Sequence, residues 1–196
     1  MVNAMTESNH LIGTIRKTAL IFALPPETAE ATSERIGGLL AEGKRVFSVH
    51  CQRPETVDRI AAAATAAGDA ALIGACGVTD SNTARAAILS GADFISTPYL
   101  DMNTVRLCHR YAKVCIPGAL SVTEVLQAIE SGCGLVGLYP AQLFGPKLLK
   151  AVKGPLPQAN LVPCGGIEEL DALQWLQAGA AAVEVTLAAG PPAAGR

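Results

Sequence analysis

The feature that most constrains the fold of this chain is the alternation of short apolar segments with longer amphipathic ones. The pattern repeats about eight times at a spacing of roughly 20 to 25 residues, which is typical of a (β/α)8 barrel. Strands are expected at residues 19–24, 46–51, 71–75, 94–96, 114–116, 134–139, 161–164 and 181–186. Helices are expected at residues 26–42, 56–67, 81–90, 102–111, 122–131, 146–152 and 168–178. The sequence therefore predicts an α/β fold, a single TIM-barrel domain over residues 1–196.

Similar short sequence segments recur at the expected turns between a helix and the next strand, which indicates repeats of one βα unit. Gly91, Gly132 and Gly179 stand in these phrases, as glycine does at many helix ends. Ser81 and Ser121 are the expected N-caps of the helices that follow them. Residues 1–15 are expected to form an N-terminal helix or arm, and residues 191–196 a flexible tail.

Charge and hydropathy narrow the classes of partner. Charged residues make up 16% of the chain, the net charge is -2, and no run of like charges occurs, so neither nucleic acid nor a membrane surface is expected as a partner. No stretch of about 18 uncharged apolar residues occurs, and the N-terminus lacks a basic segment followed by an apolar one. We expect a cytoplasmic protein that acts on a small molecule.

In a barrel of this kind the active site lies where the strands end at their carboxyl termini. The candidate catalytic residues at these positions are His50, Cys51, Cys76 and Glu184. The candidate substrate-binding residues are Gln52, Arg53, Thr97, Tyr99, Tyr139, Gln142, Gly165 and Gly166. Together they predict one pocket at the mouth of the barrel.

Sulfur is unusually common among these candidates. Because side chains alternate along a strand, only one of His50 and Cys51 is expected to face the barrel interior. A thiol with a lowered pKa, beside a histidine or a helix N-terminus, would permit covalent catalysis. Buried cysteines are also common as small apolar packing residues. The six cysteines have no CxxC or zinc-finger spacing, so we expect reduced thiols and neither a metal nor a cofactor.

Several phrases are similar to those of one enzyme family. They are residues 42–46, 73–75, 91–98, 116–118, 139–141 and 163–167. Over about residues 18–190 the chain resembles the 2-keto-3-deoxy-6-phosphogluconate / 4-hydroxy-2-oxoglutarate aldolase family. The resemblance implies an aldolase-like barrel, a homotrimer, and a lyase reaction on small 2-oxo acids through a Schiff base on lysine.

The same resemblance identifies this chain as a divergent member. It places the Schiff-base lysine of the family at Gly137, the acid/base glutamate at Ser48, and the arginine that holds the substrate carboxylate or phosphate at Gln52. The threonine of the third strand falls on Gly77, and a glycine of the eighth strand on Glu184, where a bulky anion would oppose phosphate binding. Among the remaining lysines, Lys113 is expected at the wrong end of the barrel, and Lys147 either reaches a ligand phosphate or is solvated. Arg53 and Glu55 are candidates to replace the arginine and the glutamate of the family.

Three functions stay open from the sequence. The first is an aldolase-superfamily lyase on a small 2-oxo acid, with its activity altered or lost. The second is a barrel enzyme of different chemistry, such as an isomerase, a cyclase or a thiol-dependent transferase, that uses cysteine, histidine and glutamate at the mouth. The third is a non-catalytic metabolite-binding or structural relative. Fold similarity alone cannot choose among them, because one barrel hosts many reactions.

Overall fold

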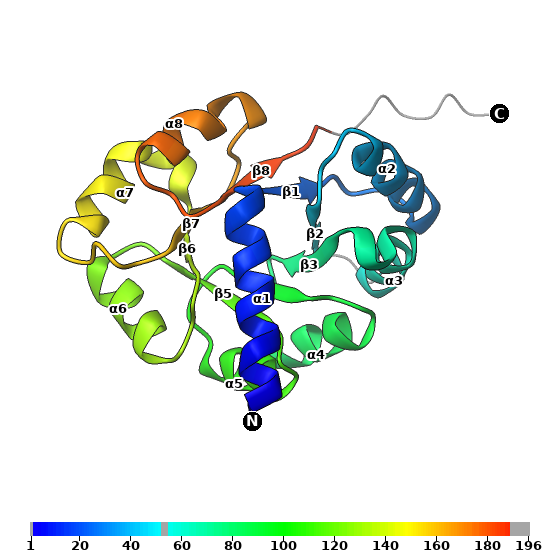
Figure 1. Cartoon of the computed structure of the whole chain (residues 1–196), viewed down its shortest axis with the longest axis horizontal. Coiled ribbons are helices and arrows are strands. Elements are labelled where there is room, and N and C mark those ends of the chain that lie inside the picture. The colour runs from blue at the N-terminus through cyan, green and yellow to red at the C-terminus, as the bar shows by residue number, and fades with distance from the viewer. Residues whose placement is uncertain (1, 52–54, 189–196) are drawn as a thin grey trace.

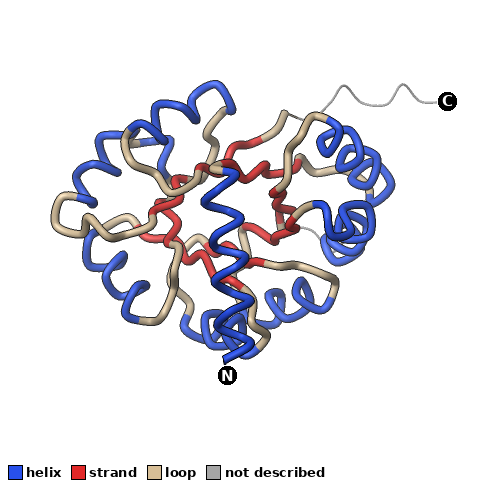
Figure 2. The backbone as a smooth tube through the Cα atoms, viewed as in Figure 1, coloured by secondary structure: helices blue, strands red, loops and turns tan. Residues whose placement is uncertain are grey.

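The computed structural model describes residues 2–51 and 55–188, and within them eight parallel strands form a barrel inside a ring of helices (Figures 1 and 2). The strands are β1 (Leu20–Leu24), β2 (Val46–His50), β3 (Leu72–Cys76), β4 (Phe94–Thr97), β5 (Val114–Ala119), β6 (Val136–Leu138), β7 (Leu161–Pro163) and β8 (Val183–Thr186). They are ordered β7-β6-β5-β4-β3-β2-β1-β8. Between β7 and β8 the backbone N–H of Ala181 donates to the carbonyl of Leu161, and that of Thr186 to Ile167, both at 2.8 Å. The predicted (β/α)8 barrel is confirmed.

The outer helices pack their apolar faces against the outward side of the strands. They are α2 (Ala29–Ala41), α3 (Thr56–Ala67), α4 (Ser81–Leu89), α5 (Met102–Arg110), α6 (Val122–Glu130), α7 (Pro146–Lys153) and α8 (Ala172–Gln177), with short 3-10 turns at Gly68–Ala70, Ala141–Leu143 and Glu169–Asp171. In α3, Ile60 and Ala63 are fully buried in this layer. Burial of one such stripe per helix is the main favourable contribution to the fold.

The first helix, α1 (Val2–Thr18), lies across the end of the barrel where the strands begin (Figure 1). Its Leu11 and Ile15 are buried in a cluster with inward side chains of the strands, among them Ile21 and Phe94. Each such burial contributes about 2 kcal/mol. The N-terminal end of the barrel interior is therefore packed with apolar side chains, which leaves the opposite end for chemistry.

Two expectations about local structure were wrong in detail. The N-cap of α4 is Asp80 and not Ser81, since the Asp80 carboxylate accepts hydrogen bonds from the backbone N–H of Asn82 and Thr83, both at 2.9 Å. Strand β5 continues beyond residue 116, because Gly118 pairs with Gly137 of β6. Glycine is needed at position 118, since a side chain there would collide with the backbone of Pro98.

Two other local expectations were right. Ser121 caps α6 in a capping box with Glu124. Gly91, Gly132 and Gly179 take the left-handed backbone conformation, with φ of 107°, 86° and 102°.

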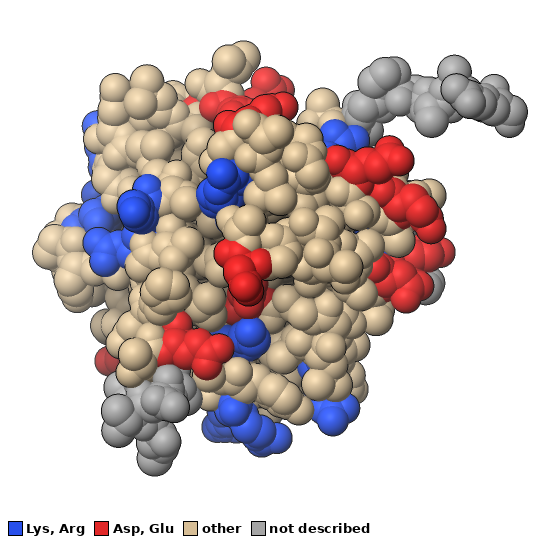
Figure 3. All heavy atoms as spheres, turned by 45° about the vertical axis from the view of Figure 1, so that its right-hand side comes forward, with Lys and Arg blue, Asp and Glu red and all other residues tan. Residues whose placement is uncertain are grey.

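The surface seen in Figure 3 is mostly uncharged, with acidic and basic side chains scattered over it. Lysine and arginine do not gather into one continuous patch on the described part of this face. None of the helices in residues 2–51 and 55–188 has the length and apolar character needed to cross a bilayer.

Candidate functional site

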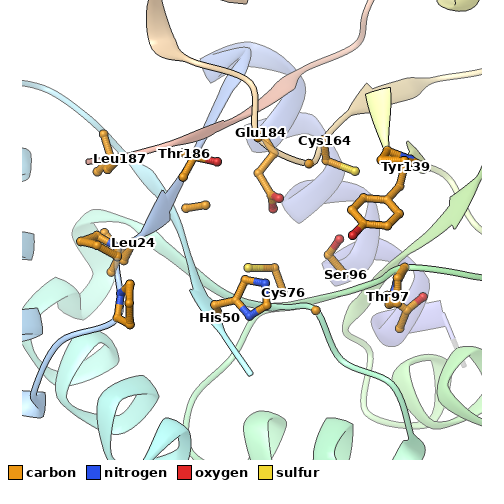
Figure 4. A pocket seen from close by; sticks show the side chains of 18 of the residues that line it. Leu24, His50, Cys76, Ser96, Thr97, Tyr139, Cys164, Glu184, Thr186 and Leu187 are labelled. Atoms are coloured by element: carbon orange, nitrogen blue, oxygen red, sulfur yellow. The ribbon is translucent and has the colours of Figure 1, made fainter. Parts of the chain in front are cut away.

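A cavity of about 570 Å³ opens at the carboxyl ends of the strands, the end opposite to α1. Strand ends and the loops after them line it, and Figure 4 shows the side chains of Glu184, Cys76, His50, Ser96, Cys164 and Tyr139 around one space. A volume of this size suits a small metabolite.

Most of the site residues expected from the sequence meet in this cavity. Those that line it are His50, Cys76, Thr97, Tyr139, Gln142, Gly165, Gly166 and Glu184. Cys51 is not among the lining residues; it packs against the core between strands and helices. Tyr99 also lies outside the lining and donates its hydroxyl to the carbonyl of Thr79 at 2.6 Å. Gln52 and Arg53 lie outside the described residues.

The side chain of Glu184 extends from β8 into the cavity (Figure 4). Its Oε2 accepts a hydrogen bond from the hydroxyl of Ser48, on β2, at 3.2 Å. Burial raises the pKa of the Glu184 carboxyl from 4.5 to about 7, and the Ser48 hydrogen bond opposes this shift. The residue retains some contact with solvent through the cavity. Near neutral pH the carboxyl is therefore available in both its protonated and its ionised form.

The raised pKa of Glu184 predicts a pH-dependent cost to stability. Between about pH 4.5 and pH 7 the unfolded chain releases this proton and the folded chain keeps it, so the free energy of unfolding falls as pH rises. Glu184→Gln removes this dependence. Relative to the wild type, the free energy of unfolding of the variant should therefore be about 2 kcal/mol more favourable to folding at pH 8 than at pH 5.

Urea unfolding of both proteins at the two pH values measures this difference. Glu130→Gln, at the exposed end of α6, is the matched control and should show no such change. An equal effect of Glu184→Gln at both pH values would contradict the assignment of a shifted carboxyl.

The two cysteine side chains of the cavity are poor candidates for thiolate chemistry. Burial raises the pKa of Cys76 well above its usual value, and the neighbouring Glu184 charge raises it further. The pKa of Cys164 is raised by the same two causes. Burial also raises the pKa of Cys51 to about 12, against the opposing effect of Arg59. At neutral pH all three thiols are protonated, which favours the packing interpretation over the nucleophilic one.

His50 is the member of the His50 and Cys51 pair that faces the cavity. Its ring packs against Gly77, where an added Cβ would lie 2.5 Å from the ring Cε1. Gly77 has φ of 69°, so glycine is required there both for its conformation and for the space it leaves. Burial, together with the Arg59 charge, lowers the pKa of His50. His50 is therefore neutral at pH 7.

The glycine loop after β7 is partly covered by Gln142. With its amide nitrogen facing the loop, Gln142 donates to the carbonyl oxygens of Gly165 and Gly166 at 3.1 and 2.8 Å. Both glycines have positive φ, 95° and 77°, and the ring of Tyr139 packs on Gly165. The side chain of Gln142 thus fixes the conformation of this loop, whose two glycines are candidate substrate-binding residues.

Gly137 lies buried in β6 beside the cavity wall. A Cβ added there would lie 3.4 Å from Cys164 Sγ and 3.4 Å from the carbonyl oxygen of Pro117, close to ordinary contact distances. The six lysines of the chain all belong to the described residues, and none of them lines the cavity. Lys113 precedes β5 and pairs with Asp93 at 3.1 Å, at the end of the barrel expected from the sequence, and Lys147 is exposed on α7.

Sequence reasoning missed Arg59. This residue lies on the buried face of α3 with Ile60 and Ala63, is only 4% exposed, and lines the cavity. Its Nη2 donates to the carbonyl of Pro25 at 2.6 Å and its Nε to the hydroxyl of Thr32 at 3.2 Å. The sequence does contain a signal for this burial. Arg59 stands three residues after Thr56 and four before Ala63, which places it on the apolar stripe of an alanine-rich helix.

The described residues contain no group of three or more histidine, cysteine, aspartate or glutamate side chains placed to hold a metal ion. The polar groups of the mouth are instead a carboxyl, hydroxyls, a neutral imidazole and a guanidinium. This set can bind an anionic small molecule and move a proton.

Comparison with known proteins gives consistent matches. The family model described as KDPG and KHG aldolase matches residues 11–189. The chain is 30% identical over 166 residues to the 2-dehydro-3-deoxy-6-phosphogalactonate aldolase of Escherichia coli K12, covering 84% of this chain and 81% of that protein. It is 32% identical over 139 residues to the 2-dehydro-3-deoxy-phosphogluconate aldolase of Pseudoalteromonas atlantica, covering 70% and 64%. A structure titled as native KDPGal superposes with a TM-score of 0.79 at 28% identity, covering 85% and 81% of the two chains.

Proposed function

Because the chain belongs to the KDPG and KHG aldolase family, we propose that its barrel mouth binds a small 2-oxo acid and transfers a proton on it without forming a lysine Schiff base. Glu184 is the acid/base group of this proposal, and Arg59 holds the carboxylate of the ligand. The observation that carries the proposal is the hydrogen bond between Glu184 and Ser48.

That hydrogen bond supports the idea that the acid/base carboxyl has moved in the sequence while keeping its place in space. The family resemblance puts the glutamate of the family at Ser48. The Glu184 carboxylate, carried by a strand on the other side of β1, reaches to within 3.2 Å of the Ser48 hydroxyl. A carboxyl with a pKa of about 7 is well suited to take and return protons at neutral pH.

The absence of a lysine from the cavity lining in the described residues supports the second half of the proposal. Schiff-base catalysis needs an amine within bonding distance of the ligand carbonyl. Gly137 provides none, and the ion pair of Lys113 with Asp93 lies at the far end of β5. The carbonyl of the ligand would therefore stay a ketone during turnover.

Arg59 is the proposed anchor for the carboxylate of the ligand. Hydrogen bonds to Pro25 and Thr32 orient the guanidinium at the cavity wall. Guanidinium groups bind carboxylates through paired N–H donors, which gives both affinity and orientation. The resemblance places the anion-binding arginine of the family at Gln52, so Arg59 would supply the same charge from α3.

A binding experiment tests the anchor. We expect Arg59→Met to weaken binding of pyruvate by about tenfold or more, because a charge-assisted hydrogen bond is lost. Methyl pyruvate, which lacks the negative charge, should bind the wild type and the variant alike. The affinity for each ligand is measured by titration, monitored by NMR or by calorimetry.

Arg106→Met, on the exposed side of α5, is the matched control. Arg59→Lys keeps the charge, so its affinity for pyruvate should lie between those of the wild type and Arg59→Met. This intermediate affinity separates loss of charge from loss of folding. Wild-type protein that binds pyruvate no better than methyl pyruvate would refute the anchor. Failure of both ligands to bind would refute the proposed function as a whole.

A non-catalytic metabolite-binding relative is the second candidate function, and the same lack of a lysine at the mouth favours it. The thiol-dependent alternative is less favoured, because burial raises the pKa of Cys76 and Cys164. Proton exchange on bound pyruvate separates catalysis from binding alone.

We also propose that the chain assembles as a homotrimer in the cytoplasm. Support for assembly comes from apolar side chains exposed on neighbouring helices α4 to α6, namely Leu89, Met102, Val122 and Leu126. One solved structure similar to this chain is titled as a cage designed by fusing symmetric oligomeric domains. All six cysteines are free, as is usual in reducing compartments.

A further inference from the structure

A second cavity, of about 390 Å³, lies at the opposite end of the barrel and shares no lining residue with the first. It is bounded by α1, by the end of α5 and by the segment before β6. Asn9, His109 and Gly132 are exposed at its edge, so it opens to solvent. Two thiols, those of Cys115 and Cys133, line it together.

The fold brings these two cysteines close. Cys115 lies near the start of β5, and Cys133 lies in the segment between α6 and β6, the strand that pairs with β5. Both side chains line the second cavity and belong to one buried cluster. The two thiols lie close enough for each to shift the pKa of the other.

Both side chains are packed on the outer side of the barrel. Cys115 and Cys133 belong to the buried cluster between strands and helices, whereas Val114 and Ile116 belong to the cluster inside the barrel. Neighbouring thiols in one cluster can approach bonding distance by rotation about χ1.

The two thiols differ in acidity. The Cys115 thiol interacts with both Cys108 and Cys133, and these hydrogen bonds, together with burial, raise the pKa of Cys115. The pKa of Cys133 is lowered because the Cys115 thiol donates to its sulfur, an effect that outweighs burial. These surroundings favour ionisation of Cys133 first, and a thiolate is the reactive form of cysteine.

We propose that Cys133 and Cys115 form a reversible disulfide when hydrogen peroxide enters this second cavity. The Cys133 thiolate attacks one peroxide oxygen, the O–O bond breaks, and a sulfenic acid and, after protonation, water are formed. The Cys115 sulfur then attacks the Cys133 sulfur, a disulfide forms, and a second water leaves. Both thiols are oxidised and the peroxide is reduced. The site is independent of the mouth and of the proposed function.

Peptide mapping of the full chain tests the pairing. Trypsin alone leaves Cys115 and Cys133 on one peptide, because the chain has no lysine or arginine between Lys113 and Lys147. Adding a glutamate-specific protease cuts after Glu124 and Glu130, so the two cysteines then lie on separate peptides joined only by a disulfide. After treatment of the folded protein with hydrogen peroxide, we expect the linked pair, and we expect a reductant to release it.

Alkylation rates and variants complete the test. A small alkylating reagent should label Cys133 about tenfold or more faster than the protonated thiols of Cys76 and Cys164. Cys115→Ser and Cys133→Ser should each abolish the linked peptides, whereas Cys108→Ser, the matched control in the same cluster, should retain them. Linkage of Cys108 in place of Cys133, or no linked peptides from folded wild-type protein, would overturn the proposal. Mapping of the wild type decides the question even if a variant fails to fold.

Discussion

Gly137→Lys is expected to create a Schiff-base site that the wild type lacks. After incubation with pyruvate and borohydride, the variant should gain the mass of a reduced pyruvate adduct on the new lysine, and the wild type should gain none. The resemblance places the lysine of the family at this position. The new amine would act as the nucleophile toward the ketone of pyruvate, which the wild-type cavity does not provide from its described lining.

The surroundings of Gly137 make this substitution feasible. The position is in β6, pairs with Gly118 and Val162, and has no left-handed backbone conformation that a side chain would oppose. The first atom of a side chain would contact Cys164 Sγ and the carbonyl of Pro117, both at 3.4 Å. These distances are close to ordinary contact, so the first side-chain atom needs at most a small shift of the flexible thiol.

Gly137→Met is the matched control, since methionine has a similar length and no amine. It should fold as well as Gly137→Lys, as measured by thermal unfolding, and should give no adduct. An adduct in the wild type, located on any of its six lysines, would show that an amine does reach the ligand and would refute the proposed mechanism.

Glu184→Gln is expected to lower the rate of proton exchange on pyruvate by about a hundredfold or more, the usual contribution of a positioned general base. In deuterated water the wild type should replace the methyl protons of bound pyruvate, followed as loss of the methyl signal in proton NMR. The Glu184 carboxylate removes a proton from the carbon beside the ketone, and the electron pair of the broken C–H bond moves toward the carbonyl oxygen.

The pH dependence of this exchange follows from the pKa of Glu184, which is about 7. The ionised carboxylate is the base, so the rate should rise with pH up to about 7 and become level above it. Below that value the rate should fall about tenfold for each pH unit. Glu130→Gln, far from the cavity at the end of α6, should leave both the rate and its pH profile unchanged.

Two results would count against this role. Exchange that is equally fast in Glu184→Gln would assign the base to another group, such as His50. Pyruvate binding without exchange in the wild type would favour the non-catalytic candidate. The binding experiment with Arg59→Met is independent of the exchange rate, so the two parts of the proposed function can fail separately.

The fold could be predicted from local patterns. Alternation of apolar and amphipathic segments, glycines at helix ends and the cap at Ser121 are properties of neighbouring residues, and each depends on short-range physics. The two differences have separate causes. At the start of α4 the choice is local: serine is a good cap, but the extended backbone and carboxylate of the preceding Asp80 hold that position. At the end of β5 the cause is tertiary, because pairing of Gly118 with Gly137 of β6 extends the strand through Pro117 and Gly118.

Part of the cavity lining could be predicted from the sequence, since the barrel fold fixes which positions lie at strand ends. Eight of the expected residues line the cavity. Orientation was not visible. His50 faces the cavity and Cys51 does not. Arg59 reaches the cavity from a helix, where hydrogen bonds to Pro25 and Thr32 join it to segments distant in the chain.

Residue patterns and family resemblance are enough to identify a barrel of this family, with Gly137 and Ser48 where the resemblance expects a lysine and a glutamate. That a carboxyl nevertheless reaches the place beside Ser48 is visible only in the folded chain. Glu184 and Ser48 are 136 positions apart, and they meet because β8 and β2 both flank β1 and turn these side chains toward the same interior. Closure of the barrel is a long-range event, and no local pattern in the sequence records which side chains it brings together.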